Sequence, residues 1–407
     1  MFSPDLSAIQ AYLLLCIWPI PVDTFGKEIS TTLSSLMLQF SMNKGLHIRG
    51  VGQDFSRVTL NPEPSLEVLR AKLWISCLIT AQRLSCAYGL PPPIIIDTFD
   101  DQIDDLPHGL LYERKVSQLL ATATVELGRM ALQASPSSAS DLRSLVSVYT
   151  GQMSQLSTLE HDDMGHYHFL SALLQIQSFN IFIGQAQADP VALIKLYSTA
   201  CSVIEKILEL DDRIQLSQCA SDYTGRMIYL ASSIILRMYR GRLKRDIDLG
   251  RGQLAYQSAI NLFRKMSIHK DDVMARSTVI ITQLWNSSTI FNQPDGTSDS
   301  FSMLCRSRLT MSSVFDVWWR WREEFAGQPH PYPEAQSPTS QRSREHAIRS
   351  SNDMLPIALT PGPPFEIRPE DDWGALFDLP AESWDLFNLD NDHAIGFDDY
   401  PMPLPTL

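Results

Sequence analysis

The chain has 407 residues, of which 44% are hydrophobic, and a formal net charge of −13 at pH 7. This length is enough to bury the core of one large domain or of two to three ordinary ones. The chain contains no uninterrupted apolar stretch of about 18 residues, so a membrane-spanning helix is not expected. The six cysteines are widely separated and never spaced as Cys-x-x-Cys. That spacing argues against a structural zinc site and favours reduced, buried thiols in a nuclear or cytosolic protein.

Helices are expected along nearly all of the first 326 residues. Apolar residues recur there at steps of three and four, whereas the alternating patterns typical of β-strands are scarce. Prolines and glycines mark several of the boundaries. We therefore expect an all-α body in which antiparallel helices share a core. The expected helices span residues 5–18, 24–44, 64–87, 112–134, 140–156, 163–185, 190–209, 221–243, 252–267, 272–291 and 302–326.

The stretch 70–107 is the most informative part of the chain. It begins with an apolar helix that contains a tryptophan and an arginine and is expected to end at a glycine. A proline run follows, and then an acidic loop that closes on another proline. The residues that mark these features are Trp74, Arg83, Gly89, Pro91, Asp104 and Pro107.

This order of features resembles the middle homology region of fungal zinc-cluster transcription factors. There, a Trp-bearing helix with an Arg leads into a Gly-x-Pro turn and an Asp-x-x-Asp-x-x-Pro loop. Residues 9–18 and 38–47 are similar to two further helices of that region. The Leu-Cys-Ile-Trp-Pro run at 15–19 is similar to the subgroup of activators of secreted proteases and weak-acid responses. The resemblance covers residues 5–325, and it implies a nuclear regulator of RNA polymerase II genes that acts as an activator.

The resemblance also implies partners. In that family the middle region is thought to restrain activation and to respond to small molecules or other proteins, and dimers are usual. A homodimer or heterodimer and a small-molecule effector are therefore expected. The family carries a basic six-cysteine zinc cluster upstream, which this sequence lacks, so zinc is expected only in that missing cluster and no cofactor in this chain. DNA would then be reached only through a missing domain or a partner. The chain would be an incomplete gene product or a regulator without direct DNA contact.

The sequence departs from the family within the Trp-bearing helix. The family commonly reads Trp-Trp-x-x-x-x-x-Asp-Arg, whereas this chain has Leu73-Trp74 and Gln82-Arg83. The missing Asp removes a candidate ion-pair partner for Arg83, so a contact with the adjacent residue is not expected.

The sequence also allows two alternative functions. Asp100, Asp101 and Asp104 match the DDxxD motif that holds magnesium ions in all-α terpene synthases. The second metal-binding motif of those enzymes is missing, and the flanking prolines favour a solvated loop, so we expect no enzyme. The other alternative is a DNA-free interaction protein that heterodimerises with a complete regulator.

A histidine-rich run and a basic run are each given a structural interpretation. His161, His166 and His168 lack the His-x-x-x-His spacing of a helical metal site, so Asp162 and Asp163 are expected to cap a helix there. The basic run is interpreted as a solvated helix end, with nuclear import as the next alternative. The residues of the possible import signal are Arg240, Arg242, Lys244 and Arg245, with Arg237 and Arg251 nearby.

The C-terminal part differs in composition from the helical domain 1–326. Residues 327–370 are rich in Pro, Ser, Gln and Arg, which predicts a disordered linker. Residues 366–407 contain eleven acidic residues and one basic residue, so they hold roughly ten of the thirteen net negative charges. Bulky residues alternate with these acids in 371–407, which is typical of an activation segment that folds against a transcription coactivator. The residues expected to bind the coactivator are Trp373, Phe377, Trp384 and Phe387. The alternative is that these side chains pack back on the body.

Overall fold

The computed structural model describes residues 6–22, 27–50, 52–60, 64–99, 106–133, 138–183, 188–270, 272–292 and 299–328. Every helix or strand element in this part of the chain is a helix, which confirms the all-α expectation. The α-helices are α1 (Leu6–Ile17), α2 (Ser30–Asn43), α3 (Pro64–Ala87), α4 (His108–Leu132), α5 (Ser138–Leu156), α6 (Asp163–Ser178), α7 (Pro190–Ile214), α8 (Leu216–Cys219), α9 (Asp222–Arg240), α10 (Leu249–Met266), α11 (Val273–Asn286) and α12 (Ser312–Ala326). Short 3₁₀ helices are η2 (Gln53–Phe55), η3 (Phe179–Ile183), η4 (Arg242–Arg245) and η5 (Leu309–Met311).

Two expected helices begin later than the apolar pattern indicated. The helix expected over 302–326 begins only at Ser312, because the backbone amides of Leu304 and Cys305 donate to the Asp316 carboxylate instead of to helical carbonyls. The helix expected from residue 24 begins at Ser30, whose amide donates to the Glu28 side chain at 2.6 Å. In both places a side-chain acceptor replaces the backbone acceptor that would continue the helix.

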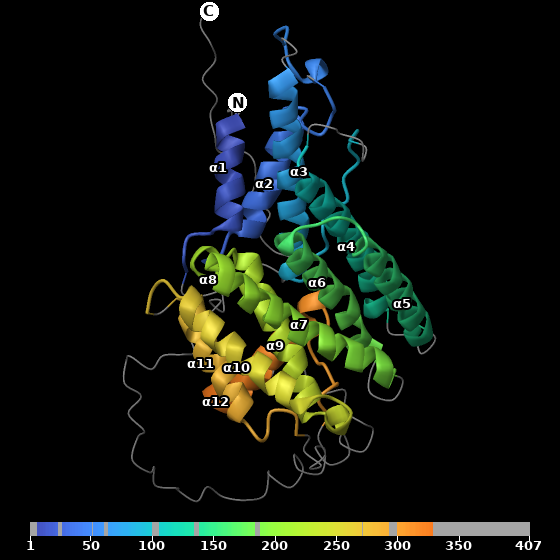
Figure 1. The fold of residues 1–407 in the computed structure, drawn as a ribbon, viewed down its shortest axis with the longest axis vertical. Helices are drawn as coiled ribbons and strands as arrows, with labels where there is room; N and C mark the ends of the chain where they lie inside the picture. Colours follow the sequence, from blue (N-terminus) through green and yellow to red (C-terminus); the bar gives the residue numbers. More distant parts are fainter. Residues whose placement is uncertain are drawn as a thin grey trace, which may run out of the picture.

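The buried side chains form two hydrophobic clusters. The first, which we call the N-terminal cluster, is built by α1, α2 and most of α3 around residues such as Met37 and Trp74. The second, the main cluster, is built by α4 to α12 around residues such as Phe179 and Phe263. Figure 1 shows α1, α2 and α3 at one end of the molecule and α10, α11 and α12 toward the other. The last turn of α3 enters the main cluster with Cys86, so this helix joins the two.

Helix α9 lies at the centre of the main cluster. Every residue from Tyr223 to Met238 is buried, including Arg226 and Arg237. It packs against α7 and α10, and α12 lies against it as well. Charged side chains on α9 are therefore removed from water and need partners from neighbouring elements.

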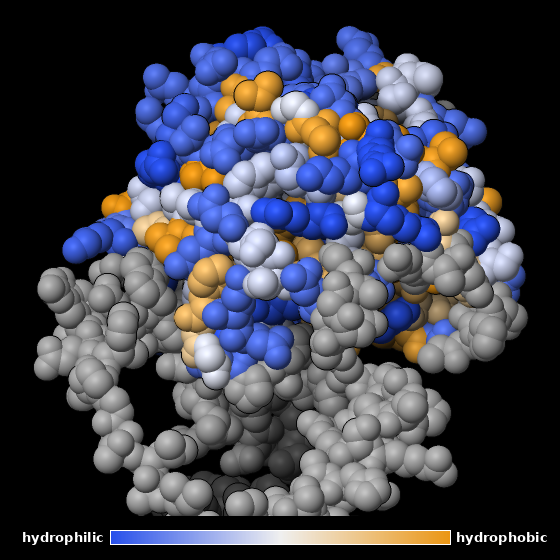
Figure 2. Space-filling view, turned by 90° about the horizontal axis from the view of Figure 1, so that it is seen from below, coloured by the Kyte–Doolittle hydropathy of each residue, from blue (hydrophilic) through white to orange (hydrophobic). Residues whose placement is uncertain are grey.

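The surface shows no sign of a membrane-spanning element in the part that the structure describes. None of the described helices combines the length and the apolar content needed to cross a bilayer. The face of the molecule in Figure 2 is mainly hydrophilic, and its hydrophobic residues occur in small separate groups.

Candidate functional site

Trp74 anchors the segment that follows α3. Its side chain is fully buried, and its indole Nε1 donates a hydrogen bond of 2.9 Å to Asp97 Oδ2. The other Asp97 oxygen accepts from Arg114 Nη2 on α4 at 2.8 Å, and Arg114 also donates to the Phe99 carbonyl oxygen. Asp97 and Arg114 are both only 5% exposed. These charge-assisted bonds hold α3, α4 and the segment between them together, so Trp74 has a structural role.

Gly89 follows α3 and ends it, as expected. Its φ is +69°, in the left-handed region. Leu90 N donates to Ser85 O at 2.8 Å and Gly89 N donates to Cys86 O at 3.0 Å, which is the bond pair of a Schellman cap. A Cβ atom at this position would lie 2.1 Å from the Arg308 carbonyl oxygen. Glycine is therefore required both by the backbone and by the close packing.

Of the other residues that mark the 70–107 stretch, the structure describes the two prolines but not the aspartate. Pro91 is exposed between α3 and α4, and Pro107 is the N-cap residue of α4. Asp104 lies outside the described residues, as do Asp100 and Asp101. The acidic loop and the magnesium site of the alternative enzyme therefore stay predictions.

Arg83 has an ion-pair partner on the next helix, although the Asp that the family has beside it is missing. Its Nη1 atom lies 2.8 Å from Glu113 Oε2 on α4. Gln82, which stands where the family has an Asp, is buried and bonds to Ser117 Oγ and to the Pro93 carbonyl oxygen. The partner for Arg83 thus comes from the next helix rather than from the same one.

Two of the three histidines stack near the start of α6. The His161 ring lies 4.7 Å from the Tyr112 ring and 5.6 Å from the His166 ring, measured between centroids. Asp162 caps the helix, as expected, because its Oδ1 accepts from Gly165 N at 2.7 Å. Among the residues that the structure describes, no three His, Cys, Asp or Glu side chains gather in a way that could hold a metal ion.

His168 lies apart from the other two histidines and contacts Arg83. Its Nε2 atom is 3.4 Å from Arg83 Nη1. Burial, together with the positive charge of Arg83, lowers the pKa of His168 well below 6.5, so the ring is neutral near pH 7. A guanidinium only donates, so Nε2 accepts this bond and the ring hydrogen is assigned to Nδ1.

Only half of the basic run is exposed, which corrects its interpretation as a solvated helix end. Arg240 is half-buried and donates to the Trp285 carbonyl oxygen at 2.6 Å. Arg251 forms two hydrogen bonds to Glu205, at 2.7 and 2.6 Å, and Arg237 is fully buried. The exposed members are Arg242, Lys244 and Arg245. Nuclear import through this run stays a prediction.

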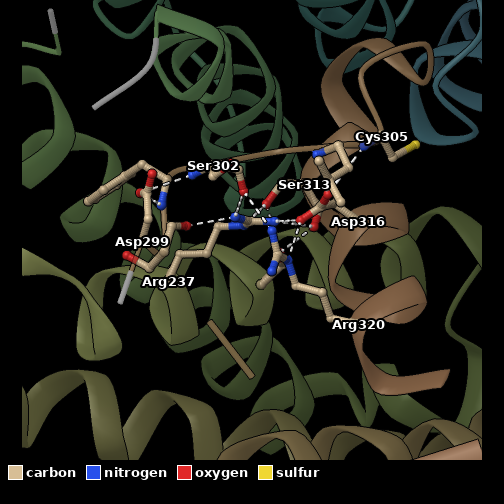
Figure 3. Close-up of polar contacts among 11 residues, drawn as sticks. Arg237, Asp299, Ser302, Cys305, Ser313, Asp316 and Arg320 are labelled. Atoms are coloured by element: carbon tan, nitrogen blue, oxygen red, sulfur yellow. Dashed lines mark hydrogen bonds and ion pairs between the residues drawn. The ribbon is translucent and has the colours of Figure 1, made fainter. Parts of the chain in front are cut away.

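Arg237 and Asp316 form the centre of a buried polar network (Figure 3). Arg237 Nη2 donates to Asp316 Oδ2 at 2.6 Å, and Arg320 Nε donates to the same oxygen at 3.0 Å. Burial alone would raise the pKa of Asp316, yet the two arginines hold it below 3.8. Burial, on the other hand, lowers the pKa of the Arg237 guanidinium below its usual value.

The rest of the network fixes the segment before α12. Arg237 Nη1 donates to the Ser300 carbonyl oxygen at 2.6 Å, and Arg237 Nε donates to Ser313 Oγ at 3.0 Å. This network was not predicted from the sequence. The available signal was a charged residue among apolar ones, since Arg237 lies between Ile234 and Met238 in a helix that is buried on all sides there.

A cavity of about 400 Å³ lies where the two hydrophobic clusters meet. It is bounded by the end of α1, by α3, by α6 and by the segment from α7 to α9, and its wall is mainly apolar. Arg83 and His168 both belong to its lining. The lining residues are Cys16, Ile17, Trp18, Thr80, Arg83, Leu84, Met164, Tyr167, His168, Ile214, Leu216, Cys219, Ser221, Tyr223 and Thr224.

A second cavity of about 200 Å³ lies beside it and shares Trp18, Cys219 and Ser221 with it. Trp18 Nε1 donates to the Cys219 carbonyl oxygen at 2.8 Å. Cys219 is exposed, whereas the other five cysteines are buried and all six are free thiols. The expectation of reduced, buried thiols is thus met at five positions.

Comparison with known proteins gives distant relatives. No protein-family model matches the chain, and no solved structure matches it. Regulatory protein LEU3 of Saccharomyces cerevisiae is 23% identical over 329 residues, which cover 69% of this chain and 35% of that protein. Transcriptional regulatory protein SEF1 of Candida albicans is 22% identical over 334 residues, which cover 76% of this chain and 36% of that protein. The chain therefore spans about a third of the length of these two relatives.

An uncharacterized transcriptional regulatory protein of Schizosaccharomyces pombe is also similar, at 27% identity over 124 residues, or 30% of this chain and 18% of that protein. All three relatives are named as fungal regulatory proteins, two of them explicitly as transcriptional. The chain is thus similar to fungal transcription regulators, a class of proteins that are typically not enzymes. This similarity supports a role in transcription regulation.

Proposed function

We propose that this chain is the helical regulatory region and activation segment of a fungal transcription activator that works in the nucleus. The observation that carries the proposal is the extent of the similarity to the two regulators, which covers 69% and 76% of the chain. The helical body spans residues 1–326, so matches of that extent must include a large part of it.

The charges of the body support a scaffold role. The buried ion pair of Arg237 with Asp316 connects α9 to α12, and that of Arg114 with Asp97 connects α4 to the segment that follows α3. Such pairs define how elements pack, because a partner in the wrong place leaves a buried charge uncompensated. A regulatory region needs one fixed packing of its helices, since it must present its surfaces and its terminal segment in the same way each time.

The activating role is proposed for residues 371–407, which lie outside the described residues, and it rests on their composition. Carboxylates repel one another and oppose collapse of the aromatic side chains between them. A coactivator groove then captures a short amphipathic helix, such as the one from Trp373 to Phe377 or the one from Trp384 to Phe387. DNA contact is proposed to occur through a domain outside this sequence or through a dimer partner.

The test of this proposal is a reporter assay in yeast with the full chain fused to a heterologous DNA-binding domain. Alanine at four aromatic positions should reduce reporter output to that of the DNA-binding domain alone. A matched control replaces four large apolar residues of the preceding segment and should retain the output. Equal activity of the two variants would contradict the proposal. The test residues are Trp373, Phe377, Trp384 and Phe387, and the control residues are Met354, Leu355, Ile357 and Leu359.

The remaining expectations stay predictions. They are the missing zinc cluster, the dimer, the nuclear import signal and the subgroup of protease and weak-acid activators. A DNA-free role as a heterodimer partner is a prediction of the same kind.

A further inference from the structure

The segment between α3 and α4 contains a short extended stretch that belongs to no sheet. Residues 91–97 run without a helix, a turn or a bend. Ile94 and Ile96 are 58% and 92% exposed, whereas Ile95 between them packs against the N-terminal cluster. This alternation is the pattern of a β-strand that has one face on a core and the other toward solvent.

The fold fixes both ends of this stretch. At its start, the Pro93 carbonyl oxygen accepts from Gln82 Nε2 on α3 at 3.1 Å. At its end, the Asp97 carboxylate is held by the two bonds described above, and Thr98 N donates to the His47 carbonyl oxygen at 3.1 Å. A binding partner therefore meets a backbone that is already ordered, which removes part of the entropy cost of association.

The backbone of Ile94, Ile95 and Ile96 has no hydrogen-bond partner in the part of the chain that the structure describes. In an extended chain, the N–H and C=O groups of alternate residues point to the same edge. The Pro93 carbonyl faces Gln82, and Ile95 shares that edge. The groups of Ile94 and Ile96 therefore point to the opposite edge, which we call the isoleucine edge. An unpaired row of N–H and C=O groups is a template for another strand.

The charges of the stretch select the kind of strand that fits. The only charged residue within 91–98 is Asp97, and it forms an ion pair with Arg114 at 2.8 Å. A charged side chain opposite Ile94 or Ile96 would thus lose hydration without gaining an ion pair. An apolar side chain there would instead remove the exposed isoleucine from water. The isoleucine edge therefore favours an uncharged strand.

We propose that the isoleucine edge binds an extended, uncharged segment of a partner protein, which adds to it as a β-strand. The partner's residues opposite Ile94 and Ile96 are β-branched or aromatic and lie beside them on the solvent face. The prolines at 91–93 have no N–H group, and Thr98 N is already bonded, so the pairing is confined to the isoleucines. This binding mode goes beyond the proposed function and does not rest on it.

A neutral five-residue peptide, acetyl-Thr-Val-Thr-Val-Thr-amide with an uncharged fluorescent label, tests the proposal on the full chain at pH 7. Methylation of the backbone nitrogen of both valines removes the donors on the edge that would pair, and it should weaken binding at least about tenfold in fluorescence anisotropy titrations. The same methylation of the third and fifth residues alters only the other edge, so the affinity should stay within about twofold. Glutamate or lysine in place of both valines should also weaken binding.

Variants of the protein locate the edge. Ile96→Pro removes one N–H group from an extended backbone, so it should reduce the affinity for the unmethylated peptide about fivefold. Ile96→Val keeps that group and a β-branched side chain, and it should leave the affinity unchanged. Because Ile96 is 92% exposed, neither variant removes core contacts, which circular dichroism verifies. In hydrogen exchange followed by mass spectrometry, the amides of Ile94 and Ile96 should exchange rapidly in the free protein and slowly with the peptide bound.

Several results would overturn the inference: no binding of the peptide, equal affinities for the two methylated peptides, or equal affinities of the two Ile96 variants. Self-association of the protein in sedimentation velocity that Ile96→Pro abolishes would show that a second copy occupies the edge, and it would overturn the inference as well. If a variant is unfolded, the ranking of the peptides on the unaltered protein decides alone. These measurements do not involve transcription, so failure of this inference and failure of the proposed function are distinguishable.

Discussion

Arg237 on α9 and Asp316 on α12 form an ion pair in which both side chains are fully buried, with 2.6 Å between Nη2 and Oδ2. Each charge has lost its hydration and depends on the other for compensation. The same carboxylate holds the backbone amides of Leu304 and Cys305. One side chain thus fixes both the position of α12 and the segment that precedes it.

Removal of one member of this pair should be costly. Asp316→Ala leaves the buried Arg237 uncompensated, so it should lower the free energy of unfolding by about 3–5 kcal/mol. Urea unfolding followed by circular dichroism measures the change. Glu205→Ala is the control, because Glu205 pairs with Arg251 at the surface with 46% of its side chain exposed. Glu205→Ala should lower the free energy of unfolding by no more than about 1 kcal/mol. Equal decreases in the two variants would refute the central role given to the buried pair.

Gly89→Ala should destabilise the protein through both backbone strain and a steric clash. The residue must keep a positive φ, and its Cβ would approach the Arg308 carbonyl oxygen to 2.1 Å. Gly327 also ends a helix with a φ of +64°, but no atom lies within 4 Å of its Cβ position. Gly327→Ala therefore isolates the backbone strain, which is about 1 kcal/mol. Thermal unfolding should show a clearly larger decrease in melting temperature for Gly89→Ala than for Gly327→Ala. A decrease no larger than that of Gly327→Ala would exclude the clash.

The contrast between Gly89 and Asp316 shows what the sequence could predict. The end of α3 is decided by residues within one turn, so a glycine followed by prolines was sufficient to place it. Most helices of the body were predictable for the same reason, since apolar periodicity is a local pattern. Arg237, the fully buried partner of Asp316, lies 79 residues away, and the late start of α12 depends on that carboxylate. No local pattern contains this information.

The sequence identified residues of the candidate site, but it did not predict which of them contact one another. Arg83 was recognised from a motif, but Glu113 and His168 reach it from α4 and α6, and their approach depends on how the helices pack. His168 was judged by its spacing from other histidines. That criterion excluded a helical metal site but gave no indication that the ring is buried beside a guanidinium.

The buried His168 should make stability depend on pH. Its folded-state pKa lies well below 6.5, whereas an unfolded chain has a histidine pKa near 6.5. Between these values only the unfolded state binds the proton, so stability is retained above pH 6.5 and falls as the pH decreases below it. One such group contributes a slope of at most about 1.4 kcal/mol per pH unit.

His168→Phe should remove that contribution. Urea unfolding at several values between pH 7 and about pH 5 should show a shallower loss of stability than in the unaltered protein. His269→Phe, at an exposed position, is the matched control and should keep the original slope. An unchanged slope in His168→Phe would show that this ring is protonated equally in the folded and unfolded states.

Cysteine reactivity should follow burial. Burial raises the pKa of the Cys16, Cys77 and Cys86 thiols to about 12, so these thiols are rarely ionised at pH 8. Iodoacetamide added to the folded protein should therefore modify Cys219 first, since it is the exposed cysteine. Mass spectrometry of peptides identifies the site, and labelling in urea should modify all six. Labelling of Cys86 in the folded protein as fast as Cys219 would contradict the described burial.

The most direct test of the account is whether this chain alters transcription when it is placed at a promoter. The whole chain, fused to a heterologous DNA-binding domain, is compared with that domain alone at a reporter with matching sites in yeast, with equal protein levels verified by immunoblot. We expect the fusion to raise the reporter output severalfold. Output equal to that of the DNA-binding domain alone would contradict the account.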